Sequence, residues 1–233
     1  MPQKIILDNR SFDIIHKTNK KIKRVSLTLE NQDEIIIKTP LGFKQHLIKE
    51  FIYEYQDWIL KAIQKVPQKN QIDFLNGGLI PFLGQSYQIK AQKDQKLKNP
   101  KLIFNQDYFI LLYNENNINN KLFYEALKKF YKTKSRQIIC PIFDKLIKQT
   151  NLYPNKISYR FAKTRWGSCS SINNISINYT LLQFDIEAIE YVVLHELCHI
   201  AQKNHSKRFW NLVSSYMPNY KSISNKIHNK LFL

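Results

Sequence analysis

A short motif in the C-terminal third of the chain places two histidines and a glutamate at the spacing of a metal-binding helix. The motif consists of His195, Glu196 and His199. Residues four apart on a helix are neighbours, with Cβ atoms about 5–6 Å apart, so both imidazoles could reach one metal ion. Glu196 would project beside the first imidazole, where its carboxylate could take a proton from a metal-bound water. The spacing therefore predicts two metal ligands and a general base.

The third ligand has to come from a histidine further along the chain. A hydrolytic zinc site needs three protein ligands and an open position for water, and neither Asp nor Glu follows the motif, which leaves His205 and His228. His205 lies six residues beyond the second motif histidine, the spacing found in metzincins, whereas His228 is interpreted as a surface residue. Metzincins have a glycine where this chain has Gln202, so we expect Asn204, which tolerates the left-handed conformation, to end the helix instead.

These residues predict a hydrolytic centre with one Zn²⁺ per chain. Zinc lowers the pKa of bound water to about 7 and polarises the attacked oxygen. Glu196 would accept the proton of that water and return it to the leaving group. Imidazole ligands also suit manganese, iron and nickel, so these metals remain alternatives.

The remaining composition limits the class of protein. Apolar residues make up 43% of the chain, which excludes wholesale disorder. Lys and Arg total 36 against 18 Asp and Glu, giving a net charge of 36 − 18 = +18. Such a charge attracts polyanions, so nucleic acid or nucleotides are possible partners, although scattered lysines equally describe a solvated surface.

The cysteines and the N-terminus indicate a cytoplasmic protein. Cys140, Cys169 and Cys198 are odd in number and widely spaced, which disfavours a disulfide framework. The N-terminal residues lack the apolar core of a signal peptide, and no stretch approaches the roughly 20 apolar residues that span a bilayer. We therefore expect reduced thiols and no membrane insertion.

Strands and helices alternate in a pattern typical of an α+β chain. Apolar and alternating runs predict strands at 4–7, 11–15, 24–29 and 34–38, a helix over 43–63 that ends before Pro67, and a second β region over 74–113. The boundary is expected near residue 115. A β-rich region over 1–115 with one long helix would then precede a mainly helical metal-binding catalytic domain over 116–233, which contains a short sheet.

The catalytic domain is expected to consist of helices around two strands. A helix over 121–149 should be kinked or split by Pro141, strands follow at 157–162 and 175–181, and the last helix starts after Ser206. Asp185 is a plausible N-cap for the helix that carries the motif. The strand over 175–181 could pair with an extended peptide.

Several motifs together resemble the YgjP-like metallopeptidase family. The specific ones are Arg165-Trp166-Gly167-Ser168-Cys169-Ser170-Ser171, residues 175–179, His195-Glu196-Leu197-Cys198-His199, and Asn204-His205-Ser206 with Phe209-Trp210. Weaker similarities at 25–27, 39–42 and 57–59 extend the resemblance over nearly the whole chain. It implies a zincin-like fold with three histidine ligands, a glutamate base and a peptide or protein substrate. It also implies kinship with SprT-like and WLM-type proteases, some of which digest proteins attached to DNA.

Other residues near the motif have less specific roles. Arg165 and Ser168 are candidates for binding substrate or stabilising negative charge, while Gly167 is interpreted as shaping the turn. Cys169 and Cys198 could approach a metal, but packing is the favoured role for both.

Two other functions remain alternatives. The same centre could hydrolyse phosphoanhydrides or phosphodiesters, which basic residues near the motif would favour: Arg160, Lys163, Arg165, Lys203, Lys207 and Arg208. A nucleic-acid-binding protein with a non-catalytic zinc is the other alternative. Structural zinc sites are usually four-coordinate and rich in cysteine, so this fits a three-histidine site poorly.

Overall fold

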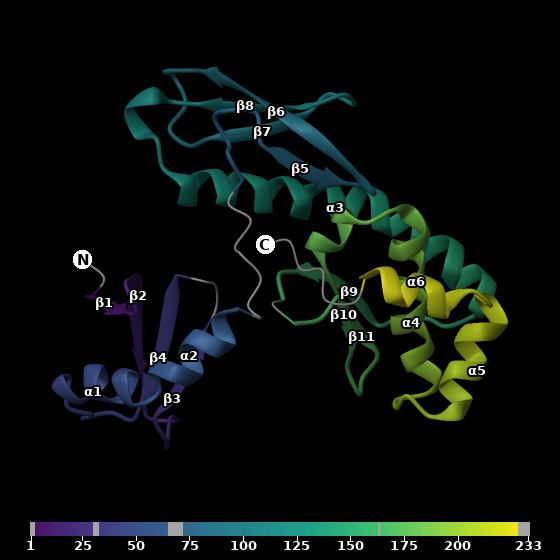
Figure 1. The fold of residues 1–233 in the computed structure, drawn as a ribbon. Coiled ribbons are helices and arrows are strands. Elements are labelled where there is room, and N and C mark those ends of the chain that lie inside the picture. The colour runs from purple at the N-terminus through teal and green to yellow at the C-terminus, as the bar shows by residue number, and fades with distance from the viewer. Residues whose placement is uncertain (1–2, 30–32, 65–71, 163, 228–233) are drawn as a thin grey trace. The chain divides into compact units, whose positions relative to one another are not determined.

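The chain adopts a mixed α+β fold, as the sequence predicts. The computed structural model describes residues 3–29, 33–64, 72–162 and 164–227. These residues form six α-helices and three β-sheets (Figure 1). They fall into two compact units, Met1–Gln71 and Ile72–Leu233.

The first unit is a four-stranded sheet with two helices. Its elements are β1 (Gln3–Leu7), β2 (Arg10–Thr18), β3 (Ser26–Leu29), β4 (Glu34–Thr39), α1 (His46–Glu54) and α2 (Gln56–Ile63). The strand order is β1-β2-β4-β3, with β2 and β4 parallel. Isoleucines of β4 and both helices share one core. The single helix expected over 43–63 is wrong, because Tyr55 leaves the helical conformation (φ −99°, ψ 16°) and separates α1 from α2. Pro67 lies outside the described residues.

A second four-stranded sheet packs along a long helix in the second unit. Its elements are β5 (Leu79–Phe82), β6 (Gln85–Lys93), β7 (Lys101–Phe104), β8 (Phe109–Tyr113) and α3 (Asn120–Thr150), with η1 (Glu115–Asn117) between sheet and helix (Figure 1). Phe82, Phe109 and Phe130 pack edge-to-face in the core between them. Of the two outcomes expected at Pro141, a kink or a split, the split does not occur, because α3 continues past the proline. Ile139, Ile142 and Phe143 are buried on either side of it, and their burial offsets the lost backbone hydrogen bond.

A small three-stranded sheet leads to the motif. It consists of β9 (Lys156–Arg160), β10 (Gly167–Cys169) and β11 (Asn174–Asn178) in the order β10-β11-β9, with β11 antiparallel to β10 and parallel to β9. The sequence predicted strands at the positions of β9 and β11 but not β10, which lies between them in the chain, in a Gly- and Ser-containing stretch. After β11, η2 (Tyr179–Gln183) connects the sheet to the next helix.

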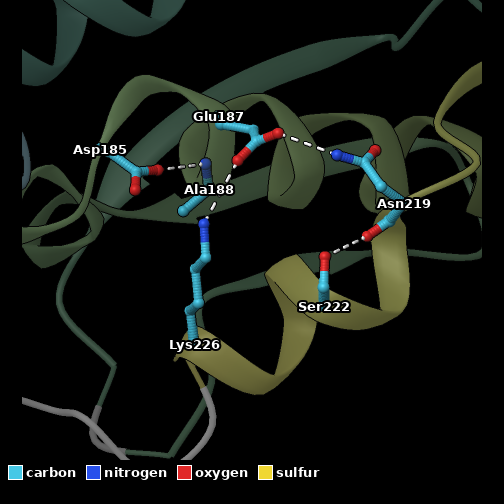
Figure 2. Close-up of polar contacts among 6 residues, drawn as sticks. All are labelled: Asp185, Glu187, Ala188, Asn219, Ser222 and Lys226. Carbon is cyan, nitrogen blue, oxygen red and sulfur yellow. Dashed lines mark hydrogen bonds and ion pairs between the residues drawn. The ribbon is translucent and has the colours of Figure 1, made fainter.

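Three helices complete the second unit: α4 (Ile186–Ala201), α5 (Lys207–Tyr216) and α6 (Tyr220–Ile227). Figure 2 shows the start of α4, where Asp185 Oδ1 accepts a hydrogen bond from the Ala188 amide at 2.8 Å, which confirms the predicted N-cap. Glu187 accepts a hydrogen bond from Asn219 Nδ2 at 2.9 Å and forms an ion pair with Lys226 at 3.4 Å, which fastens α6 to α4. The helix predicted after Ser206 corresponds to α5, and α6 follows it as a further helix.

The first compact unit ends before Ile72, whereas the sequence placed a boundary near residue 115. The β5–β8 sheet shares its core with α3 and α4. A catalytic domain confined to 116–233 stays a prediction. Among the described helices, none combines the length and apolar character needed to cross a membrane.

Candidate active site

The three predicted metal ligands come together at one point. The ligand atoms of His195, His199 and His205 all lie within 4.8 Å of one another. The Nε2 atoms of His195 and His205 are 3.0 Å apart. Nitrogens held about 2.0–2.1 Å from one tetrahedral zinc lie roughly 3.3 Å apart. The triad therefore needs only small adjustments to hold a metal ion.

The loop after α4 brings His205 back without a glycine. The chain leaves the helix at Gln202, which is extended (φ −131°, ψ 100°) and so has no need of a glycine at that position. Asn204 is not among the described residues with positive φ, so the expectation that it ends the helix in a left-handed conformation is wrong. The Gln202 carbonyl lies 3.1 Å from His199 Nδ1. A backbone carbonyl thus provides the acceptor that metal-binding imidazoles usually have.

Two aromatic residues of α5 support the triad. The buried Phe209 ring contacts all three imidazoles, with centroid distances of 4.9 Å to His195, 4.5 Å to His199 and 4.8 Å to His205. Trp210 stacks nearly parallel on His205, at a centroid distance of 5.5 Å and an interplanar angle of 20°. Neither residue was predicted from the sequence to have a role in the site. The sequence did contain a signal for this role, because both residues follow His205 by four and five positions on a predicted helix.

Glu196 lies against the backbone of β10 at Gly167. Glu196 is only 5% exposed. A Cβ added to Gly167 would lie 2.5 Å from Glu196 Oε1, closer than real Cβ atoms approach, so only glycine fits here without moving the carboxylate. The role predicted for Gly167, shaping a turn, missed this contact, because nothing in the local sequence reveals which residue a strand will touch.

Burial sets the electrostatics of the site. It raises the pKa of Glu196 to about 8, and the positive charge of Arg165 opposes this rise. Burial, together with the smaller effects of the neighbouring His199 and His205, lowers the pKa of His195 to about 3. Neutral imidazoles are the form that binds metal, and a cation held there would favour the ionised carboxylate.

Unsatisfied polar atoms also fit a cation at this position. His195 Nδ1 and Glu196 Oε2 are buried and have no hydrogen-bond partner among the described residues. Buried polar groups without partners are uncommon and call for an explanation. The explanation is most direct for Glu196, whose carboxylate lines the same cavity as the three imidazoles. The donor set, three histidines and a nearby carboxylate, is that of an open hydrolytic metal site.

The triad and Glu196 line a cavity of about 540 Å³. Arg165 and Ser168, the predicted substrate-binding residues, line it too, as do Cys169 and Lys203. Cys198 is fully buried in the core, in agreement with a packing role. Lys207 and Arg208 are exposed on α5 and do not line the cavity. Lys163 and His228 lie outside the described residues.

The strand predicted to pair with an extended peptide is the central one of its sheet. β11 is hydrogen-bonded to β10 on one side and to β9 on the other. It therefore has no free edge, and the prediction for 175–181 is wrong. β10 is an edge strand, and within the described part of the chain no other strand pairs with its outer edge.

Comparison with known proteins identifies one family. A family model described as YgjP-like, metallopeptidase domain, matches residues 23–230. A search of curated proteins found no match.

Two solved structures are similar to part of the chain. The metallopeptidase zymogen abylysin of Pyrococcus abyssi is 22% identical, with a TM-score of 0.37, over 40% of this chain and 94% of that one. The metallopeptidase zymogen jannalysin of Methanocaldococcus jannaschii is 27% identical, with a TM-score of 0.35, over 38% of this chain and 92% of that one. Each similarity covers less than half of the chain.

Proposed function

The chain belongs to the YgjP-like metallopeptidase family, and from this premise we propose that it is a zinc-dependent peptidase acting on extended segments of peptides or proteins. The observation that carries the proposal is the convergence of three imidazoles on one point of a cavity that Glu196 also lines. The same geometry supports a zincin-type site, as opposed to a structural zinc site rich in cysteine.

His195, His199 and His205 would hold one Zn²⁺, leaving a position open to solvent and substrate. When bound, zinc lowers the pKa of a coordinated water and polarises the carbonyl of the peptide bond. Phe209 and Trp210 keep the imidazoles in place by packing against their rings. Gln202 fixes the orientation of His199 by accepting a hydrogen bond from Nδ1.

Glu196 is the general base in this proposal. Its Oε2 has no partner among the described residues, so that atom is free to take a proton from the attacking water. The carboxyl group can then give the proton to the leaving amine, because peptide hydrolysis needs an acid at that step. Gly167 keeps the carboxylate in the cavity by allowing β10 to approach it closely.

The substrate is expected to lie along β10. Arg165 and Ser168 line the cavity on that side and would bind the substrate. The free edge of β10 can add an extended peptide as a further strand, which aligns its backbone across the site. A chain held in this way presents one peptide bond to Glu196 and the metal.

Cleavage by the metal-loaded protein tests the role of Glu196. Wild type and Glu196→Gln are compared on unfolded protein and on peptides by mass spectrometry. We expect Glu196→Gln to retain about one zinc per chain and to lose activity by about 100-fold or more, because general base catalysis typically contributes that much. Peptidase activity retained by Glu196→Gln would refute the role. Cleavage of nucleotides in place of peptides would favour a phosphoanhydride hydrolase, the alternative that Arg165 and Lys203 in the cavity suggest.

Metal content tests the ligand set independently of any substrate. His205→Ala should lose most of the zinc after purification without added metal, because two histidines alone make a weak site. His46→Ala is the matched control, since His46 is exposed at the start of α1 in the other unit. Full zinc occupancy in His205→Ala, measured by elemental mass spectrometry, would contradict the three-histidine site.

A further inference from the structure

A second cavity adjoins the catalytic one and carries two arginines. Its volume is about 330 Å³, and its lining includes Arg160, Arg165, Trp166, Ser168, Ser176 and Asn178. None of its described lining residues is an aspartate or a glutamate. The ion pairs seen among the described residues involve neither arginine. The cavity is therefore positively charged and has no carboxylate of its own to neutralise it.

Buried polar residues of β11 hold both arginines in position. Arg160 Nε donates a hydrogen bond to Ser176 Oγ at 2.6 Å. Asn178 Nδ2 donates to the carbonyls of Ala162 at 2.7 Å and Arg165 at 3.2 Å, which orders the segment that carries the second guanidinium. Ser176 and Asn178 are themselves buried. Both arginines are exposed to solvent. The bond to Ser176 orients the Arg160 side chain, and the bonds from Asn178 fix the backbone from which the Arg165 side chain extends.

The two cavities share a wall. Residues 164–168 line both. In β10, Gly167 is opposite the core residue Ile177, whereas Ser168 is opposite Ser176. Because successive side chains of a strand point to opposite faces, Gly167 contacts Glu196 and Ser168 faces the arginine cavity. A peptide extended beside β10 would alternate in the same way, so a side chain next to the cleaved bond would point to the face of the sheet that carries the arginines.

We propose that Arg160 and Arg165 form a carboxylate-binding subsite that selects an acidic side chain next to the cleaved peptide bond. The subsite rests on the proposed peptidase function and adds its substrate class. Guanidinium groups bind carboxylates with two parallel hydrogen bonds, which are stronger than those to neutral groups. A glutamine side chain has the same shape, but only its amide oxygen accepts hydrogen bonds. It therefore cannot form the same pair of bonds with a guanidinium group. Glutamate should therefore be preferred over glutamine.

The test uses the zinc-loaded full chain. Cleavage sites in a mixture of peptides of known sequence are mapped by mass spectrometry, and pairs differing only by Glu or Gln at the enriched position are synthesised. We expect kcat/KM to be at least about 10-fold higher for the Glu peptide. Arg160→Gln should reduce that ratio to near one while changing cleavage of the Gln peptide less than about threefold. Arg160→Lys should restore part of it, because lysine keeps the charge without the planar fork.

Arg136→Gln is the matched control, since Arg136 is exposed on α3 and lines neither cavity. It removes the same charge from the same unit and should leave the Glu/Gln ratio unchanged. Equal cleavage of both peptides by the wild type overturns the subsite and leaves the peptidase intact. An equal loss for both peptides in Arg160→Gln, or the same loss of ratio in Arg136→Gln, also overturns it.

Binding separates failure of the subsite from failure of the peptidase. Fluorescence anisotropy is measured with labelled Glu and Gln peptides on wild type and Arg160→Gln. A preference for the Glu peptide that disappears in Arg160→Gln, without any cleavage by the wild type, would refute the peptidase but support the carboxylate subsite. No preference in binding or cleavage would overturn the subsite.

Discussion

The two sides of the catalytic cavity are built in different ways. On one side, α4 and the loop to α5 carry all three imidazoles and Glu196 within eleven residues, from His195 to His205. On the other side, β10 contributes Gly167 and Ser168, which lie about thirty residues earlier in the chain and meet α4 only in the folded protein. In the proposed mechanism the helical side would hold the metal and the base, whereas the strand side would restrain the base and face the substrate.

This difference decides how each side should respond to mutation. On the helical side, each imidazole packs against Phe209. A substitution that removes one of these contacts therefore leaves the other rings packed. On the strand side, one missing Cβ leaves the space that the Glu196 carboxylate occupies. We therefore expect single substitutions on β10 to affect catalysis more than metal binding, and those on α5 to do the reverse.

Among substitutions outside the His195–His205 segment, Gly167→Ala should have the largest effect on activity. The added methyl would lie 2.5 Å from Glu196 Oε1, so the carboxylate has to move out of its position. A misplacement of about 1 Å can lower the rate about 100-fold. We expect such a loss in kcat, measured with a peptide substrate, while zinc content stays near that of the wild type. If Gly167→Ala keeps full activity, or loses its zinc, the proposed division between the two sides is wrong.

Trp210→Leu should mainly weaken metal binding. Trp210 stacks on His205 and on Tyr220, at centroid distances of 5.5 Å and 5.3 Å, and so fixes the third ligand. Loss of groups that orient metal ligands typically costs 10–100-fold in affinity. Competition with a zinc chelator measures the change. Tyr216→Leu is the control, because Tyr216 is on the same helix but 41% exposed. Equal zinc affinities for Trp210→Leu and the wild type would contradict a role of α5 in metal binding.

The smallest effects are expected at the far end of α4, where it meets α6 (Figure 2). Asp185→Ala removes an N-cap and should destabilise the protein by about 1 kcal/mol. For a domain of this size that lowers the melting temperature by about 2–4 °C. Lys226→Gln breaks an exposed ion pair and should cost about 0–1 kcal/mol. Thermal unfolding measures both, and a larger effect of Lys226→Gln than of Asp185→Ala would reverse this order.

Much of the fold could be predicted from local patterns. The strands of the first unit, α3 and the start of α4 lie close to where alternation, helical periodicity and a capping Asp185 placed them. The errors share a physical cause. Pro141 stays inside α3 because packed residues on both sides stabilise the helix, and β10 forms because β11 is available to pair with it. Neither effect is visible in a window of sequence.

The sequence by itself determined the spacing of His195, Glu196 and His199 along a helix, which predicts a metal site, and the absence of later acidic residues pointed to His205. Only the tertiary structure decided what surrounds that centre. Gly167 lies against Glu196, Phe209 packs against the imidazoles, and Arg160 and Arg165 line one cavity. Each arrangement depends on the packing of separate elements. Helical spacing is set by covalent geometry, whereas such contacts depend on how whole elements pack.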